Sequence, residues 1–411
     1  MPRVVIVNDA SVARGGATGL ALMQARMLAA RGVETRLFTG DRGEGCDLPE
    51  SIARDHAGTD PLMTARPWVA ATRGLWSRPV LALLRDRIAQ HDSPDTVYHV
   101  HSWSKTLTPS VFAALRPVAP RVFLHAHDFF LACPNGGYMD YRAMRPCARV
   151  PLSVSCLVTN CDKRSYAQKG WRVARQAVLR SALPRHAPWA AILMIHPGMA
   201  PLLEQAGYPA RLLRPLRNPA TALCPAPVTP SRNSVFLFIG RVEAEKGVEE
   251  LCAAADAAGV PMVVIGDGPL RAPLAARHPG IRFTGWLDRP AIAREAAQAR
   301  AVVMPSRYPE PFGLVAAEAA LSGLPVIVSR TALLAPEIEA KGLGLACDTR
   351  DPVALRGTLT RMATLSAAEI EAMAARGRDG AGGLCLTPGA WIDAQLALYE
   401  AAISRARQSA A

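Results

Sequence analysis

Short apolar runs alternate with amphipathic segments at the start of the chain. Residues 4–7 form a continuous β-branched run, which is typical of a strand covered on both faces. Gly15 and Gly16 follow, residues 20–30 carry apolar side chains at helical spacing, and 35–38 is the next apolar run. This pattern predicts a strand, a glycine loop, a helix and a second strand.

A proline-rich stretch then separates two series of such elements. Residues 97–100 and 122–124 are further short strands of the first series, and residues 224–230 contain three prolines without any periodicity, as in a linker. The second series begins after it, with strands at 235–239, 262–265, 282–285, 301–304 and 326–328 and helices at 248–258 and 312–322. Strands and helices that alternate on both sides of a joint predict two doubly wound parallel sheets.

The predicted organisation is α/β with two Rossmann-like domains. Residues 1–215 are expected to form the first domain and 216–385 the second, and 386–411 is expected to be a helix that can cross back to the first domain. Two such sheets are expected to face each other across a cleft. Ligands bind beyond the carboxyl ends of parallel strands, so binding motifs should lie in loops that follow strands.

The charge of the chain is uneven. Its formal net charge is +13, and residues 1–200 hold 25 basic and 14 acidic residues, whereas residues 201–411 hold 22 and 20. Codon usage in a GC-rich genome explains why most of the positive residues are Arg, but it does not explain their concentration in one half. We therefore expect an anionic partner for the first half, either the anionic surface of a membrane or an anionic glycan.

No apolar run reaches the ~18 residues that a membrane-spanning helix needs. The apolar run at 4–7 is too short for a signal peptide and lacks a cleavage site. We therefore expect a cytoplasmic protein, peripheral at the inner face of a membrane if that is its anionic partner, and no disulfide framework. Five scattered cysteines are expected to be small core residues: Cys46, Cys224, Cys252, Cys347 and Cys385.

The strongest chemical signal is the motif at residues 308–318, which follows the strand at 301–304. Glu310 stands before a helix that Pro311 can start, and Glu318 lies about two turns further on, so both carboxylates can face one cleft. A solvated acidic helix start is the simpler interpretation for either glutamate alone, but not for the whole motif. The first turn should present three free N–H groups to an anion, those of Phe312, Gly313 and Leu314.

A second motif follows the strand at 235–239. Gly240 frees the backbone, and Arg241 and Lys246 stand five residues apart before the next helix. Lys246 is one of five lysines in the chain, so codon usage does not account for it. A guanidinium fork and an ammonium point charge suit a diphosphate, although surface pairing with neighbouring glutamates would explain either cation alone.

Three more glycines stand directly after predicted strands, namely Gly266, Gly268 and Gly285. Each alone indicates only a turn. Together with the two motifs above, they predict loops that are shaped around a nucleotide, although they match neither the dinucleotide fingerprint nor a P-loop.

In this order, the segments GRVEAEKG, VVIGDGPL, FTGWL and EPFGLVAAE resemble the donor-binding domain of the retaining glycosyltransferases of family 4, the group 1 glycosyl transferases. The resemblance covers residues 235–350 well and the N-terminal half more loosely. It implies the GT-B fold, with an active-site cleft between two facing Rossmann-like domains. It also implies transfer of a sugar, with retention, from a nucleotide-diphosphate-sugar to a hydroxyl of a glycan or lipid-linked glycan, in cell-surface polysaccharide or glycolipid synthesis.

The same resemblance implies roles for individual donor-side residues. Arg241 and Lys246 match the pair that binds the diphosphate and stabilises it as leaving group. Glu318 matches the carboxylate on the ribose, and Glu310 matches the one beside the donor sugar. The amides of Phe312, Gly313 and Leu314 match those over sugar and phosphate.

The N-terminal half carries fewer matches. Gly15 and Gly16 match a loop that closes on the donor, and His127 matches a histidine near the anomeric centre and the acceptor. His125 lies two residues earlier on the same strand face, so the choice between the two histidines stays open. The chain contains no Asp-x-Asp sequence, which predicts catalysis without a metal-bridged diphosphate and without a cofactor.

Four cysteines lie close together in an insertion at about residues 133–161. Cys133, Cys147, Cys156 and Cys161 are separated by 13, 8 and 4 residues, which differs from paired C-x2-C zinc knuckles. A structural zinc ion is one interpretation of the four sulfurs. Reduced buried thiols and a redox disulfide are the others.

Three alternative functions compete with this interpretation. An epimerase or a glucan phosphorylase could use the same fold, but a phosphorylase should need a lysine for pyridoxal phosphate, and Lys246 is the one candidate. A basic nucleic-acid-binding protein should have aromatic residues interleaved with its basic ones. With 6% aromatic residues and dispersed arginines, no nucleic-acid partner is expected.

Overall fold

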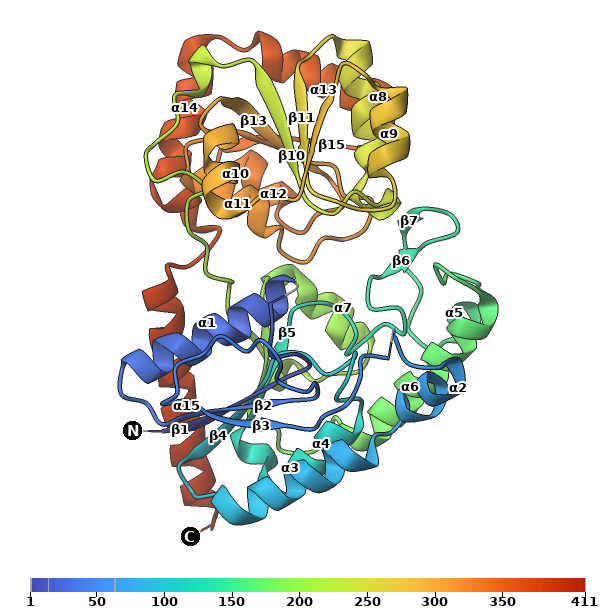
Figure 1. Cartoon of the computed structure of the whole chain (residues 1–411), viewed down its shortest axis with the longest axis vertical. Helices are drawn as coiled ribbons and strands as arrows, with labels where there is room; N and C mark the ends of the chain where they lie inside the picture. Colours follow the sequence, from blue (N-terminus) through green and yellow to red (C-terminus); the bar gives the residue numbers. More distant parts are fainter. Residues whose placement is uncertain (1, 14, 63, 411) are drawn as a thin grey trace. The chain divides into compact units, whose positions relative to one another are not determined.

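The computed structural model describes residues 2–13, 15–62 and 64–410 and divides into two compact units (Figure 1). Unit 1 contains Met1–Gly137, Ala148–Leu216 and Gly389–Ala411. Unit 2 contains Tyr138–Cys147 and Arg217–Pro388. The prediction placed all of residues 1–215 in the first domain, whereas the segment Tyr138–Cys147 groups with unit 2.

Unit 1 is built on a parallel sheet of seven strands in the order β3-β2-β1-β4-β5-β8-β9. Every neighbouring pair is parallel, and β4 stands between β1 and β5, with Val4 opposite Val97 and Tyr98 opposite Val122. The strands are β1 (Arg3–Asn8), β2 (Thr35–Thr39), β3 (Ala53–His56), β4 (Thr96–Val100), β5 (Val122–Ala126), β8 (Ala191–Met194) and β9 (Leu213–Pro215).

The helices of unit 1 cover this sheet. The longer ones are α1 (Gly16–Ala30), α3 (Arg78–His91), α6 (Tyr166–Ala182) and α15 (Pro388–Ala410). The shorter ones are α2 (Pro67–Arg73), α4 (Ser110–Leu115), α5 (Val154–Val158) and α7 (Ala200–Gln205), with 3-10 turns η1 (Arg116–Arg121), η2 (Pro197–Met199) and η3 (Ala210–Leu212).

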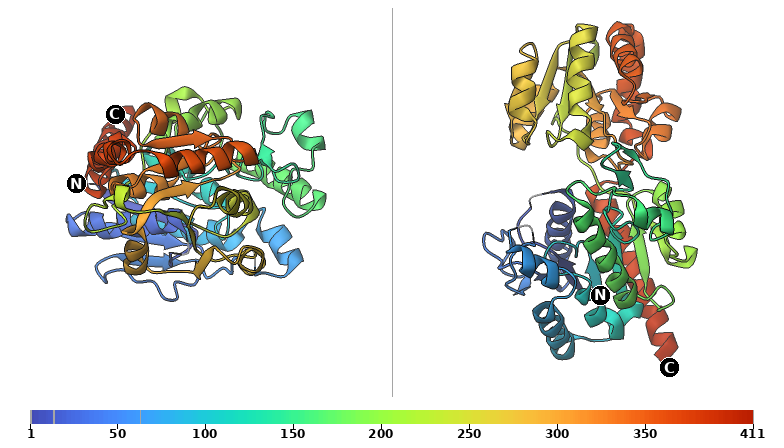
Figure 2. Two further views of the ribbon diagram at one scale, coloured as in Figure 1. Left: turned by 90° about the horizontal axis from the view of Figure 1, so that it is seen from above. Right: turned by 90° about the vertical axis from the view of Figure 1, so that its right-hand side faces the viewer.

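The C-terminal helix α15 is part of the core of unit 1. Trp391, Ile392 and Tyr399 are completely buried, and Arg31, the residue directly after α1, forms an ion pair with Asp393. In both views of Figure 2 the end of the chain lies with the N-terminal segments of this unit. The observed span, Pro388–Ala410, corresponds to the helix predicted for residues 386–411.

Unit 2 is built on a parallel sheet of six strands in the order β12-β11-β10-β13-β14-β15. The strands are β10 (Val235–Ile239), β11 (Met262–Ile265), β12 (Arg282–Gly285), β13 (Ala299–Met304), β14 (Val326–Ser329) and β15 (Gly344–Cys347). The helices are α8 (Val248–Ala258), α9 (Arg271–Arg277), α10 (Arg289–Ala296), α11 (Leu314–Leu321), α12 (Ala335–Ala340), α13 (Pro352–Thr364) and α14 (Ala367–Arg378). The 3-10 turns are η4 (Pro230–Arg232), η5 (Ala244–Lys246) and η6 (Gly380–Gly383), and β6 (Met139–Asp140) pairs antiparallel with β7 (Arg145–Pro146).

Alternate side chains of the unit 2 strands fill two separate hydrophobic cores, one on each face of the sheet. Leu237 and Val302 belong to one core, and Phe236 and Val303 belong to the other. This two-sided burial is why the strands appear in the sequence as continuous apolar runs. The predicted α/β class, with two Rossmann-like parallel sheets, is confirmed.

One predicted helix boundary was wrong. The helix predicted at 312–322 begins at Leu314, because Gly313 adopts a left-handed conformation with φ of 78° and becomes the N-cap. Pro311 therefore stands in the loop and does not start the helix. Among the residues that the structure describes, no helix is both long and apolar enough to cross a bilayer.

The burial of α15 makes a direct stability prediction. Replacing Trp391, which is 0% exposed, by Ala should lower the free energy of unfolding by about 3–5 kcal/mol, because a large buried side chain leaves a cavity. The control Val353→Ala shortens a side chain that is 67% exposed, and it should change the free energy of unfolding little. Urea denaturation followed by circular dichroism measures both; equal midpoints would contradict the packing of α15.

Candidate functional site

Four side chains meet at the carboxyl edge of the unit 2 sheet. The Lys246 ammonium nitrogen lies 2.8 Å from Glu310 Oε2 and 2.8 Å from the Tyr308 hydroxyl oxygen. Ser306 Oγ donates to the same Glu310 oxygen over 3.0 Å. Lys246 ends the turn η5 after β10, and the other three lie in the loop after β13, so the pairing of β10 with β13 brings them together. We call these four residues the lysine–glutamate group.

Charge compensation sets the protonation of this group. Burial raises the pKa of Glu310, but Lys246, Tyr308 and Ser306 outweigh this effect, and the pKa lies below its usual value. Burial and the neighbouring Glu310 raise the pKa of Tyr308, so its hydroxyl keeps its proton. At neutral pH the site therefore contains an ionised carboxylate with an ammonium and two hydroxyl groups against it.

The other predicted cation of the donor motif is placed differently. Arg241 is 64% exposed and forms an ion pair with Glu243, with 2.7 Å between Nη1 and Oε1. Lys246 is only 19% exposed and is paired with Glu310. The binding of a diphosphate by both cations remains a prediction.

The predicted glycines bring three loops into backbone contact. Gly240 N–H donates to Ile265 O over 3.0 Å, and Gly266 N–H donates to Gly285 O over 2.8 Å. At Gly266, φ is 135° and a Cβ atom would lie 1.9 Å from Gly240 O, so no other residue fits there. Gly268 lies in the same loop after β11. These glycines close the loops at the sheet edge that carries the lysine–glutamate group.

The second predicted carboxylate, Glu318, lies on α11 and is 17% exposed. Its Oε1 lies 3.3 Å from Nη1 of Arg289, whose Nη2 also donates to Thr221 Oγ1 over 2.8 Å. Burial raises the pKa of Glu318, and Arg289 lowers it by less, so the net shift is upward. No sequence pattern pointed to Arg289, because its contact with Glu318 joins two helices and residues that are 29 positions apart.

The start of α11 presents backbone donors. Phe312 is buried at 2% exposure, and Gly313 is the N-cap. Within the described residues, no acceptor contacts the N–H groups of Leu314 and Val315. The same holds for the N–H groups of Phe312 and Gly313, so the predicted set Phe312–Leu314 remains a prediction, and Val315 offers a further free donor beside it. A helix start of this kind attracts anions.

The N-terminal glycines open α1 in unit 1. Gly15 is the N-cap and Gly16 is the first residue of the helix, and both are exposed. Among the described residues, chain neighbours aside, no atom lies within 4 Å of a Cβ built at Gly15. A role of this pair in covering a donor remains a prediction.

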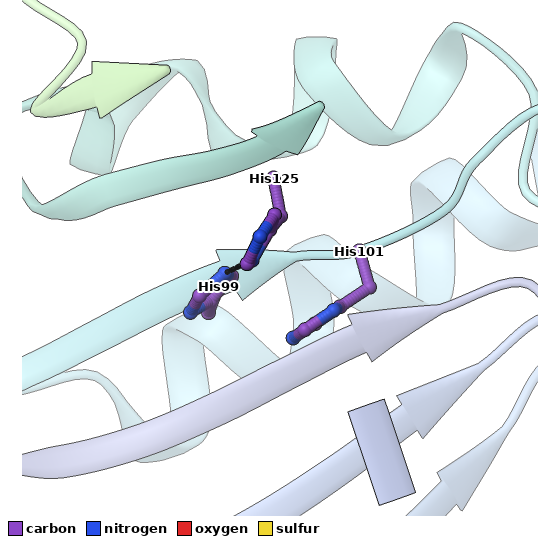
Figure 3. Close-up of side chains that lie close together, drawn as sticks. All are labelled: His99, His101 and His125. Carbon is purple, nitrogen blue, oxygen red and sulfur yellow. Dashed lines mark hydrogen bonds between the residues drawn. The ribbon is translucent and has the colours of Figure 1, made fainter. Parts of the chain in front are cut away.

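Unit 1 holds a cluster of four imidazoles at the carboxyl ends of β4 and β5, consisting of His99, His101, His125 and His127, which we call the histidine cluster. The rings are stacked, with centroids 4.4 Å apart for His99 and His101 and 4.2 Å apart for His125 and His127. Figure 3 shows three of the rings, which come from the two adjacent strands. The sequence motif pointed to His127 and His125, and His99 and His101 were not predicted. The signal was available as the same His-x-His pattern at the ends of two strands.

Hydrogen bonds connect the cluster to α1 and α15. His101 Nδ1 lies 2.9 Å from His127 Nε2, and His101 Nε2 lies 2.6 Å from Gln24 Oε1. Gln24 Nε2 lies 2.9 Å from His99 Nδ1 and also donates to Tyr399 OH over 2.6 Å. His127, which is partly exposed, is thus held in place by a chain of buried polar groups.

Three of these rings are close enough to share a metal ion, since ligand atoms of His99, His101 and His125 lie within 4.8 Å of one another. Their hydrogen bonds argue for another role. Both ring nitrogens of His99 and of His101 have partners, and the three ring planes are only 15–28° apart. Metal ligands instead direct free lone pairs at one point. The cluster is best described as a stacked hydrogen-bonded network.

The four imidazoles are uncharged at neutral pH. Burial lowers the pKa of His99, His101 and His125 far below its ordinary value, and the neighbouring rings lower it further. Burial lowers the pKa of His127 to about 3. His127 therefore offers a neutral imidazole to any group that reaches it.

The predicted cysteine set divides between the two units. Cys133, Cys156 and Cys161 are buried in unit 1, and Cys147 belongs to the segment of unit 2 that contains β6 and β7. Asn135 lies between two of the sulfurs, with 3.2 Å from Oδ1 to Cys133 Sγ and 3.5 Å from Nδ2 to Cys161 Sγ. The zinc interpretation of these sulfurs remains a prediction.

Comparison with known proteins supports the assignment of the fold. Residues 233–364 match the family model described as glycosyl transferases group 1. Over 200 residues the chain is 31% identical to glycogen synthase from Mycobacterium tuberculosis, covering 44% of this chain and 45% of that protein. Over 125 residues it is 39% identical to the GDP-mannose-dependent alpha-(1-6)-phosphatidylinositol dimannoside mannosyltransferase of the same species. That alignment covers 28% of this chain and 32% of the mannosyltransferase.

These alignments span less than half of the length of either relative. Among solved structures, the sucrose-phosphate synthase of Thermosynechococcus elongatus superposes with a TM-score of 0.72 at 19% identity, covering 98% of this chain and all of that one. The structural neighbours confirm the predicted GT-B fold.

The histidine cluster predicts how stability depends on pH. An unfolded histidine takes up a proton near pH 6.5, whereas the buried ones stay neutral, so unfolding binds protons and stability falls as the pH drops below 6.5. Replacing His125 by Gln should reduce this slope by about one proton, or about 1.4 kcal/mol per pH unit.

Urea denaturation at pH 7, 6 and 5 measures the slope for each variant. The control is His91→Gln, because His91 is exposed at the end of α3 and its replacement should keep the slope. An unchanged slope in His125→Gln would show that the cluster is already protonated in the folded protein.

Proposed function

We propose that the protein is a glycosyltransferase that moves a sugar from a nucleotide-diphosphate-sugar to a hydroxyl of a glycan or lipid-linked glycan, with retention and without a catalytic metal. The observation that carries the proposal is the lysine–glutamate group. It lies at the carboxyl edge of the unit 2 sheet, inside the region that matches the glycosyl transferases. Parallel α/β sheets bind ligands at this edge.

The proposed chemistry needs the charges found there. Breaking the bond between sugar and diphosphate builds positive charge on the sugar and negative charge on the departing phosphate. Fixed positive groups near that phosphate lower the barrier, because they need no reorganisation during the reaction. Lys246 and the N–H groups at the start of α11 supply such charge, and the exposed Arg241 side chain has freedom to reach a phosphate.

In this proposal, Glu310 accepts hydrogen bonds from the donor sugar. It is ionised and held by Lys246, Tyr308 and Ser306, which leaves lone pairs for hydroxyl groups of the donor sugar. Glu318, held by Arg289, is the second hydroxyl-binding carboxylate and is assigned to the ribose. In a retaining reaction of this kind, the departing phosphate can accept the proton of the attacking hydroxyl.

His127 is the proposed contact to the acceptor or the sugar in unit 1. It is neutral at physiological pH because burial lowers its pKa to about 3, so it acts as a hydrogen-bond partner and not as a fixed cation. His101 holds the His127 ring through its Nε2, and Gln24 in turn holds His101, which together set the direction in which the His127 ring points.

The alternatives on the same fold differ in what they need from Lys246. A phosphorylase with pyridoxal phosphate needs an amine that forms a Schiff base, for which it must be neutral, whereas Lys246 lies 2.8 Å from a carboxylate that favours its charged form. A transferase uses that charge directly. An epimerase would use the same contacts to the nucleotide sugar, and it is distinguished from a transferase by the product that it releases.

The donor site makes a direct prediction about activity. Lys246→Met and Glu310→Gln should each lower the rate of transfer by about 100- to 1,000-fold, the effect of removing one fixed stabilising group. The measurement is release of the nucleoside diphosphate from a panel of nucleotide sugars, with the anomeric configuration of the product determined by NMR.

The matched control is Glu295→Gln, which removes a carboxylate of a peripheral ion pair with Arg282 and should leave the rate unchanged. Full activity of both site variants would refute the assignment of the site. An inverted product would refute retention, and a free epimeric nucleotide sugar would identify an epimerase.

For the anionic partner of the basic half, we propose the surface of an anionic membrane. Exposed apolar residues gather around α5, and we call Val150, Val154, Leu157, Val158 and Tyr166 the α5 patch. Val154, Leu157 and Val158 are 76%, 39% and 67% exposed and lie at i, i+3 and i+4, so they share one helix face. The Tyr166 hydroxyl donates to Leu157 O over 2.9 Å and fixes this ring beside them.

Positive charge accompanies the apolar face. Lys163 and Arg164 are exposed between α5 and Tyr166. Apolar side chains that insert among lipid headgroups, flanked by cations, are typical of proteins that bind anionic membranes. Such a membrane is also where a lipid-linked acceptor would lie.

The α5 patch can be tested with vesicles. The protein should sediment with vesicles that contain anionic lipid in low salt, and Val154→Glu with Val158→Glu should abolish this, because two carboxylates oppose both insertion and attraction. Val353→Glu is the control, since Val353 is equally exposed at 67% but lies in unit 2. Equal sedimentation of both variants would contradict the patch, and an absence of binding by the unmodified protein would favour the anionic glycan.

A further inference from the structure

A groove lies in the helical layer of unit 1, between α3, α4 and α6, and we call it the α3–α6 groove. Its volume is about 340 Å³. α4 packs against both of the other helices, and the three lie together in Figure 1. Pockets that bind small molecules have volumes of about 300–1,000 Å³, so the groove is large enough for a small ligand.

Two arginines bring positive charge to this groove. Arg85 of α3 and Arg116, the first residue of η1, are both exposed and line it. In the part of the chain that the structure describes, neither side chain has an ion-pair or hydrogen-bond partner, and no carboxylate lines the groove. Asp86, which follows Arg85 in the sequence, is bound to Arg87 and Gln90 instead. The positive charge of the groove is therefore not compensated.

The other polar side chains of the wall can also donate hydrogen bonds. The Trp76 indole N–H and the Ser181 hydroxyl have no partner among the described residues. A guanidinium and an indole N–H can only donate, so the serine hydroxyl is the one side-chain acceptor among these groups. A molecule that fits the groove must therefore supply several acceptors, as an anion with several oxygen atoms does.

Part of the wall is apolar. The half-buried ring of Trp76 lines the groove together with the side chains of Ala113 and Val178. An indole ring packs well on flat or apolar groups. The ligand should therefore have an apolar or aromatic body as well as an anionic group.

We propose that the α3–α6 groove binds a small soluble phosphate monoester, with the phosphate on Arg85 and Arg116 and an apolar or aromatic body on Trp76. A guanidinium binds two oxygens of a phosphate at once. A phosphate monoester carries a charge of about −1.5 to −2 at pH 7, which matches two guanidinium groups. A carboxylate has one charge and would leave one arginine without a partner.

The groove is separate from the two sites described above. All of its lining residues belong to unit 1, whereas the lysine–glutamate group is in unit 2. None of its lining residues is a member of the histidine cluster. Its occupation is therefore measured as binding, without any assay of sugar transfer.

The first experiment compares two probes by isothermal titration calorimetry of the purified full chain. Phenyl phosphate should bind at one site, and inorganic phosphate should bind about 10-fold more weakly, because it lacks the ring that packs on Trp76. Trp76→Leu should bring the two affinities together. An absence of saturable binding, or equal affinity for both probes in the unmodified protein, would overturn the proposal.

The second experiment tests the arginines. Arg85→Gln with Arg116→Gln should weaken the binding of phenyl phosphate by about 100-fold, the effect of losing two charged hydrogen-bond partners. Both side chains are exposed, so the fold should persist, which circular dichroism checks. The matched control is Arg211→Gln with Arg214→Gln, which removes two exposed arginines of unit 1 outside the groove and should retain binding. Equal affinity of the two double variants would overturn the site.

Two further arms distinguish this groove from other phosphate sites. Lys246→Met changes the proposed donor site and should retain the binding of phenyl phosphate. Loss of binding in Lys246→Met, with retention in the variant that lacks Arg85 and Arg116, would place the phosphate in unit 2 and overturn the groove. Binding of short-chain phosphatidic acid without binding of phenyl phosphate would indicate a lipid headgroup and overturn the assignment to a soluble ester.

Discussion

In a parallel sheet, all strands end at the same edge, and this constraint places the functional groups of both units. Lys246 follows β10 and Glu310 follows β13, 64 residues later, yet their side chains form an ion pair because the two strands are neighbours. His101 follows β4 and His127 follows β5, and these rings meet for the same reason. In each unit, the sheet order decides which loops share a site.

Buried polar groups in this protein are compensated in two different ways. Glu310 is compensated by an ammonium and two hydroxyls and stays charged. Among the described residues, the hydrogen-bond partners of the histidine cluster include no carboxylate, and burial keeps its rings neutral. The same cost of removing charge from water therefore leads to an ion pair in one unit and to a neutral stack of rings in the other.

Sequence patterns predicted where the strands lie more accurately than they predicted which side chains contact each other. The strands of unit 2 are buried on both faces, so they appear as apolar runs, and the boundaries predicted for β10 and β11 agree with the structure. The start of α11 was misplaced because a proline at a favourable position is a weaker determinant than the left-handed Gly313. Arg289 was missed because its contact with Glu318 joins elements that no local pattern connects. His99 and His101 were missed although the repeated His-x-His pattern at the ends of two strands is visible in the sequence. The partner of Lys246 depends on strand order, which no local pattern contains.

The position of α15 has a consequence for how the chain is made. Trp391 and Tyr399 are in the core of unit 1, whereas nearly all of unit 2 is continuous from Arg217 to Pro388. During synthesis, the unit that begins first therefore cannot complete its core until residues 389–410 have left the ribosome. The strands β1 to β5 must wait, with the surface that α15 will cover still open to water, while most of unit 2 is already synthesised.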